Sequence, residues 1–209
     1  MPPDNAPLAH AHGGGSNPRQ RRQLANIGLY LLLTSLAMLF GSSMLVYLLI
    51  RTRVFGDASL IPPLGAIHAP QSLLLSTAIM LLSSYTIHQA LRSVRFERQT
   101  ALRRFLLFTL ILAVAFIIVQ APSLAILLRD HYAAMHGHRV FLYGMIFFLI
   151  LIHAAHVLGG IIALVVTLKH AYAGRYDHEH HQGVRHTALY WHFLDIVWLI
   201  MFILFFALR

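Results

Sequence analysis

Five long apolar segments follow one another along this chain, and short polar stretches separate them. The segments cover about residues 24–50, 71–91, 103–128, 139–168 and 186–208. A helix needs about 20 mainly apolar residues to cross a bilayer, and each segment reaches that length. Several segments are longer, which favours tilted helices or helices that extend beyond the hydrocarbon layer. The pattern therefore predicts an all-α, polytopic membrane helix bundle with five transmembrane helices.

Residues 1–23 differ from the rest of the chain because they are rich in Pro, Gly, His and Asn and show no apolar periodicity. We expect a disordered polar head here, followed by a transmembrane domain over residues 24–209. His10 and His12 could contact a metal ion, although a solvated low-complexity segment is the simpler explanation. The first apolar segment is too long for the hydrophobic region of a signal peptide, so we expect no cleaved signal.

The composition agrees with a membrane protein, since 58% of the residues are hydrophobic and only 11% are charged. A soluble domain of this size carries far more charge on its surface. The chain contains no cysteine, which excludes disulfides, thiolate metal sites and the c-type haem attachment motif.

The formal net charge of +9 comes almost entirely from arginine. Basic residues gather in the head and in the stretches that follow the second and fourth apolar segments. Positive residues favour the cytoplasmic side, so the amino terminus is predicted in the cytoplasm and the carboxyl terminus outside. Membrane topology explains the basic charge without a nucleic-acid partner. The arginines between the second and third segments are candidates for contacts with lipid headgroups: Arg92, Arg95, Arg103 and Arg104.

The last apolar segment contains an aspartate and two tryptophans on one helical stripe. At about 100° per residue, Trp191, Asp195 and Trp198 fall on the same face, with His192 beside it. Ionisable residues at membrane depth are costly and usually face a protein interior. We therefore expect this stripe to be a docking or functional face. Asp195 either accepts hydrogen bonds in a buried network or takes part in proton chemistry.

The fourth apolar segment carries His153 and His156 one turn apart, with Gly159 and Gly160 shortly after. These histidines could ligate a metal or haem or relay protons. Alternatively, they form hydrogen bonds between helices at a place where glycine lets a neighbour approach closely. Two histidines one turn apart on one helix would not hold a single haem between them.

Gln120 is the remaining candidate for a buried polar network, because it precedes Pro122 in the third segment and could satisfy backbone groups that the proline frees. No nucleophile–base pair, phosphate loop or complete metal-ligand motif is present in the sequence. We therefore expect no catalytic residue, no cofactor-binding residue and no metal ligand in this chain.

Several of these motifs resemble one family. YWHFLDIVW at residues 190–198 is similar to the final-helix signature of subunit III of haem-copper oxidases. HAAHVLG at residues 153–159 and the helix start at residues 70–76 resemble two further family motifs. The resemblance covers about residues 24–208, and five helices are typical of the short bacterial form. One departure is that Ser35 is followed by Leu36, where the family usually carries an acid.

The resemblance implies a non-redox accessory subunit of a proton-pumping terminal oxidase in the aerobic respiratory chain of a bacterial plasma membrane. Such a subunit packs against the haem- and copper-bearing subunit I, with subunit II and possibly subunit IV in the same complex. It binds phospholipid and supports proton uptake and the stability of the complex, while haem and copper stay in partner subunits.

Other functions stay open at this point. A related subunit III-like protein could serve a nitric oxide reductase. A small membrane transporter or proton channel could use His153, His156, His192 and Asp195, and a membrane cytochrome could use the histidines as ligands. The electron donor, cytochrome c or quinol, is bound by other subunits in the resembling family, so this chain does not reveal it.

Overall fold

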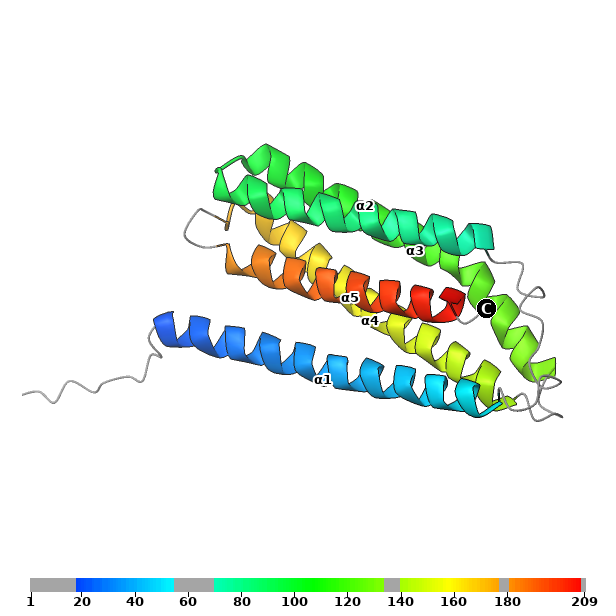
Figure 1. Cartoon of the computed structure of the whole chain (residues 1–209). Coiled ribbons are helices and arrows are strands. Elements are labelled where there is room, and N and C mark those ends of the chain that lie inside the picture. The colour runs from blue at the N-terminus through cyan, green and yellow to red at the C-terminus, as the bar shows by residue number, and fades with distance from the viewer. Residues whose placement is uncertain (1–17, 55–69, 134–139, 177–180, 208–209) are drawn as a thin grey trace, which may run out of the picture.

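The computed structural model describes residues 18–54, 70–133, 140–176 and 181–207, and this part of the chain contains five helices (Figure 1). They are α1 Pro18–Val54, α2 Pro70–Arg95, α3 Gln99–Ala133, α4 Val140–Tyr172 and α5 Gln182–Ala207. Each helix contains a span long and apolar enough to cross a membrane. The prediction of an all-α chain with five such helices is confirmed.

The helix ends differ from the expected ones, most clearly in α1. This helix begins at Pro18 and not at residue 24, so residues 18–23 of the expected polar head are helical. Proline suits the first helical position because its missing N–H would have no partner there. The rest of the head, with His10 and His12, lies outside the described residues.

Four helices form the centre of the bundle. α2 packs against α3 and α5, and α4 packs against the same two helices. α1 packs against α4 and α5 and lies at the edge of the bundle (Figure 1). The start of α1, the α2–α3 turn, the end of α4 and the start of α5 all lie at one end of the bundle (Figure 1). This end carries many arginines, and we call it the basic end.

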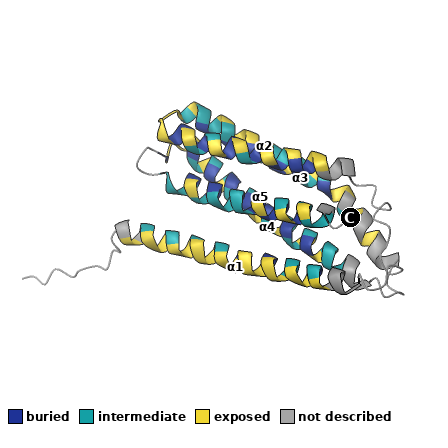
Figure 2. Cartoon of the chain, in the orientation of Figure 1, coloured by how far each residue is buried: buried dark blue, intermediate teal, exposed yellow. Residues whose placement is uncertain are grey.

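Burial follows the same division. Side chains of α2, α3, α4 and α5 enclose an apolar core, whereas most of α1 is exposed (Figure 2). Within the described part of α1, the buried side chains are those of Leu36, Phe40 and Tyr47. Such wide apolar exposure suits a helix whose solvent is lipid, because hydrocarbon chains are as apolar as leucine.

The turns at the basic end need unusual backbone conformations. Glu97 lies between α2 and α3 with φ 56°, in the left-handed region that few non-glycine residues adopt. Gly174 lies two residues after the end of α4 with φ 66°, and the N–H of Arg175 bonds the carbonyl of His170 at 3.1 Å. A left-handed residue just past a helix satisfies its last carbonyl groups. These turns let α3 and α5 fold back beside the helices that precede them.

Candidate functional site at the α2–α5 seam

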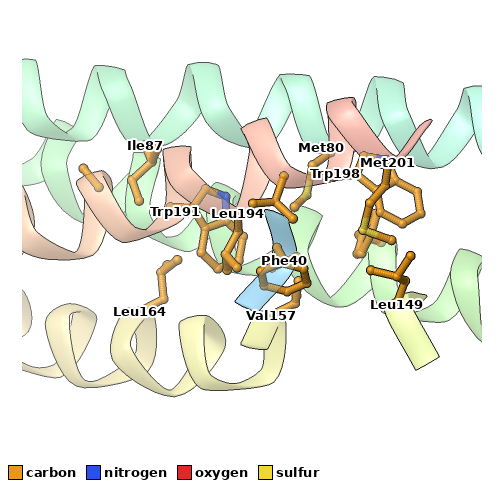
Figure 3. Packing of buried hydrophobic residues seen from close by; sticks show 14 of the residues in the cluster. Phe40, Met80, Ile87, Leu149, Val157, Leu164, Trp191, Leu194, Trp198 and Met201 are labelled. Carbon is orange, nitrogen blue, oxygen red and sulfur yellow. The ribbon is translucent and has the colours of Figure 1, made fainter. Parts of the chain in front are cut away.

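The aromatic stripe of α5 points into the bundle. Trp191, Asp195 and Trp198 are 0%, 3% and 2% exposed, and the two indoles lie among side chains from α1, α2 and α4 (Figure 3). A side chain that its own chain encloses this completely cannot contact a second protein. Of the two expected roles, a docking face or a buried polar network, the burial of these three residues fits the second, in which they join α5 to the other helices.

Both indole N–H groups have partners on α2. Trp191 Nε1–H donates to Ser83 Oγ at 3.0 Å, and Trp198 Nε1–H donates to Thr77 Oγ1 at 3.2 Å. The Ser83 hydroxyl in turn donates to the carbonyl of Met80 at 2.8 Å. A buried indole normally needs such an acceptor. The α2–α5 seam is therefore held by hydrogen bonds as well as by apolar packing.

Gly160 of α4 makes room for Trp191. A Cβ added at this glycine would lie 2.9 Å from Cζ3 and 3.1 Å from Cε3 of the Trp191 ring. The same addition at Gly159 would meet the Tyr190 hydroxyl at 3.6 Å, which is an ordinary contact. The predicted close approach at a glycine is therefore real, and it occurs at Gly160 against α5.

His192 and Asp195 form the polar part of the seam. His192 Nδ1 is 2.8 Å from Ser84 Oγ on α2 and 3.8 Å from Asp195 Oδ2. The His192 side chain is 33% exposed and that of Asp195 only 5%. The ring of His88 on α2 lies 6.4 Å from the ring of His192, centroid to centroid. A polar path thus leads from the side of the bundle at His88 to the buried carboxyl of Asp195.

The two histidines of α4 face different neighbours. The ring of His153 is buried and lies 5.3 to 6.3 Å from the rings of Trp198, Phe40 and Phe116. His156 donates from Nδ1 to its own helix, at the carbonyl of Ile152, 2.7 Å away. The two imidazoles therefore do not converge on a shared ligand. Within the described ranges, no group of three or more His, Asp or Glu could hold a metal ion.

Three buried polar side chains come from three different helices. Gln120 of α3, His153 of α4 and Asp195 of α5 have polar side-chain atoms without a hydrogen-bond partner among the described residues. Buried polar groups in proteins are normally paired. The interior of the bundle therefore contains polar groups that the hydrogen bonds of the α2–α5 seam do not pair.

The candidate lipid-binding arginines divide into two kinds. Arg92, Arg95 and Arg104 are exposed. Arg103 is half-buried, because its Nε–H donates to the carbonyl of Ala171 at 3.1 Å and its guanidinium lies 5.3 Å from the centre of the Tyr172 ring. Arg103 therefore caps the end of α4, where a cation also complements the helix dipole.

A second contact fastens the same end of the bundle. Gln99 Nε2–H donates to the carbonyl of Tyr176 at 2.6 Å, joining α3 to the residues that follow α4. Burial raises the pKa of the Tyr176 phenol, so the ring stays neutral well above neutral pH. A Cβ at Gly183 would clash with this ring.

With this geometry in place, comparison with known proteins identifies the family. The family model described as cytochrome c oxidase subunit III matches residues 11–208. The chain belongs to the cytochrome c oxidase subunit III family. Two similar curated proteins are the cytochrome c oxidase subunit 3 of Drosophila melanogaster, 34% identical over 145 residues, and that of Pongo pygmaeus, 31% identical over 144 residues.

Each of these alignments covers 68% of this chain, and they cover 53% of the Drosophila protein and 51% of the Pongo protein. The chain thus spans about half the length of the curated relatives that it matches. The resemblance drawn from the helix motifs is confirmed at the level of the family.

The α5 motif depends on hydroxyl partners on α2 that the sequence motifs do not include. Ser83 and Ser84 lie on α2, and Thr77 lies on the same face of that helix. The sequence contains a pattern that indicates these partners, because two pairs of hydroxyl residues, Ser76-Thr77 and Ser83-Ser84, lie seven residues apart. Two helical turns separate such positions, so both pairs face the same neighbour.

Proposed function

We propose that this chain is a non-redox accessory subunit III of a proton-pumping haem-copper terminal oxidase. It packs against the haem- and copper-bearing subunit I, in a complex with subunit II and possibly subunit IV. The observation that carries the proposal is the family match over residues 11–208, which includes the α5 motif built into the core of the bundle.

The histidine geometry supports a role without redox chemistry in this chain. Aromatic rings from α1, α3 and α5 occupy the surroundings of His153, and His156 bonds its own helix. A haem needs axial ligands that reach its iron from opposite faces or leave one face open. We therefore place all haem and copper in the partner subunits.

We further propose that the amino terminus lies in the cytoplasm and the carboxyl terminus outside, in the plasma membrane of a bacterium. The gathering of the α1 start and the α2–α3 turn at the basic end supports this orientation. In the same proposal, residues 1–23 contribute a polar cytoplasmic segment, of which residues 18–23 extend α1, and residues 24–209 form the membrane domain.

Phospholipid binding and support of proton uptake complete the proposal. Arg92, Arg95 and Arg104 are exposed and can meet lipid phosphate groups at the basic end. Arg103 is excluded from this set because its guanidinium is already engaged with α4. Leu36 stands where the family usually carries an acid, directly after Ser35, and its side chain is buried. Any support of proton uptake by this chain therefore uses other groups.

Isolation of the chain from native membranes in mild detergent tests the proposal. We expect a haem-copper subunit to co-purify, with the absorption of its haem in the fraction and its sequence in the mass spectrum. The sequence of that partner also separates an oxidase from a nitric oxide reductase. A chain that never brings down a haem protein, or that alone catalyses pH-dependent flux in liposomes, would contradict the proposal.

A further inference from the structure

A cluster of polar residues is exposed on the side of the bundle beside the α2–α5 seam. The ring of His88 on α2 lies 6.4 Å from that of His192 on α5, and Gln89 Nε2–H donates to the Tyr85 hydroxyl on α2 at 2.8 Å; we call these four residues the polar island. Tyr85 is 58% exposed, His88 is exposed and the His192 side chain is 33% exposed. The contact between His88 and His192 places the island on the α2–α5 side of the bundle.

The surface around the island is apolar. On α5 the outward positions beyond His192 are isoleucines, and on α2 the outward positions before Tyr85 are leucines: Ile196, Ile200, Ile203, Leu74, Leu81 and Leu82. This is the surface that lipid chains solvate at no cost. The polar island interrupts it with groups that lipid chains cannot hydrogen-bond, which is unfavourable at membrane depth.

Two exposed hydroxyl groups of α1 do not pose this problem. On α1, Thr34 Oγ1–H donates to the carbonyl of Tyr30 at 2.9 Å, and Ser42 Oγ–H donates to the carbonyl of Leu39 at 3.1 Å. These side chains are satisfied by their own helix. For His88, by contrast, the structure shows no hydrogen bond within residues 18–54, 70–133, 140–176 and 181–207.

The position of the island along the membrane spans favours a protein over a lipid headgroup as its cover. The membrane span of α2 runs from Leu74 to Arg95, and Arg92 stands near its basic end. His88 lies one turn deeper, ~6 Å along the helix axis. His192 lies near the middle of the α5 span, Gln182–Phe205. A headgroup at the level of Arg92 would have to reach at least one helical turn deeper to bond the island, so a protein side chain is the better-placed partner.

The charges around the island indicate what kind of side chain this is. The exposed charged groups nearest along α2 and α5 are Arg92 and Arg185. The sole acid in either helix is Asp195, which is buried. The face therefore offers imidazole and phenol donors in a weakly positive setting, and a complementary partner offers a hydrogen-bond acceptor, best a carboxylate.

From these observations we propose that the polar island is the surface on which a transmembrane helix of a partner subunit docks, with an acceptor side chain of that helix bonded to His88 and Tyr85. This inference rests on the proposed function, because it supplies the contact face that the buried α5 stripe does not. It deepens that function by assigning the α2–α5 face, not the outer face of α1, to the partner.

Partner retention, measured as haem per chain after the chain is purified from membranes in mild detergent, tests this assignment. We expect His88→Leu to lower retention roughly tenfold, in line with the loss of one or two membrane hydrogen bonds. We expect His88→Gln, which keeps a donor and an acceptor, to restore most of it. Thr34→Leu on α1 is the matched control and should retain the partner like the wild type. Equal retention by His88→Leu and the control would overturn the proposal.

A photoreactive benzoylphenylalanine at position 88 gives a second test that does not depend on affinity. We expect irradiated membranes to yield an adduct between this chain and a second membrane protein, whereas position 34 yields only background. Adducts to lipid alone would overturn the docking surface and favour a lipid site. If the wild type retains no haem protein, the proposed function fails, and the crosslink at position 88 then decides the docking surface by itself.

Discussion

α1 and α5 are about equally apolar, yet the bundle treats them very differently. In the most apolar part of the α5 membrane span, 39% of the residues are buried inside the bundle. In the corresponding part of the α1 span, only 11% are buried. The polar side chains account for the contrast. Those of α5 bond other helices, as Trp191 does with Ser83, whereas Thr34 and Ser42 of α1 bond their own backbone. Near the start of α1, the Asn26 side chain does bond His186 of α5, at 2.7 Å. In a membrane, polar groups and close packing, and not hydropathy, decide which helix lies inside.

Gly160 offers the sharpest way to break this contrast. Replacing it with alanine places a methyl group 2.9 Å from the Trp191 ring, so either α4 or the indole must move. Overpacking of this kind costs about 1–3 kcal/mol. At Gly41 of α1 a Cβ would meet no atom within 4 Å, so Gly41→Ala should change stability by no more than about 0.5 kcal/mol. Thermal unfolding in detergent measures both; equal shifts would refute the interior role of Gly160.

Asp195 tests whether the seam depends on an acceptor or on a charge. Its carboxyl lies 3.8 Å from His192 inside the bundle. If it serves as a packing acceptor, Asp195→Asn should be milder than Asp195→Leu, by about 1–2 kcal/mol, because the amide keeps an acceptor. Chemical denaturation in detergent, together with the yield of assembled complex, gives the ranking. The same loss from both variants would favour a charge-dependent role.

Ser83 and Ser42 form a matched pair for the hydrogen bonds themselves. Ser83→Ala removes the acceptor of the buried Trp191 indole, whereas Ser42→Ala removes a hydroxyl that bonds only its own helix. Interhelical hydrogen bonds in membranes contribute about 0.6 kcal/mol on average, up to about 1.7 kcal/mol. We expect Ser83→Ala to lie in this range and Ser42→Ala to lie near zero. The unfolding free energies of the two variants decide the point, and the reverse order would contradict the internal seam.

The smallest expected effect separates two neighbouring arginines at the basic end. Arg103→Leu removes a hydrogen bond to the last turn of α4, at a cost of about 0.5–1 kcal/mol. Arg104→Leu should leave the unfolding midpoint unchanged and instead reduce the amount of anionic phospholipid that co-purifies, measured by lipid mass spectrometry. A lower midpoint for Arg104→Leu with unchanged lipid would reverse the roles assigned to the two residues.

The sequence by itself predicted the number and class of the helices, because the length of an apolar segment is set by the thickness of the bilayer. It also predicted the family, through the α5 motif at residues 190–198, and it placed Gly160 at a close helix contact. These features depend on the composition and spacing of residues within one segment, so they can be predicted without knowing which helices pack together.

Tertiary structure alone decided which way the motif faces. The sequence placed Trp191, Asp195 and Trp198 on one stripe, but lipid and a packed helix are equally apolar surroundings, so hydropathy could not tell an inward stripe from an outward one. The partners Ser83 and Ser84, the capping role of Arg103 and the exposed polar island come from contacts between helices distant in the chain. Such contacts follow from the packing of helices against one another, which no single segment encodes.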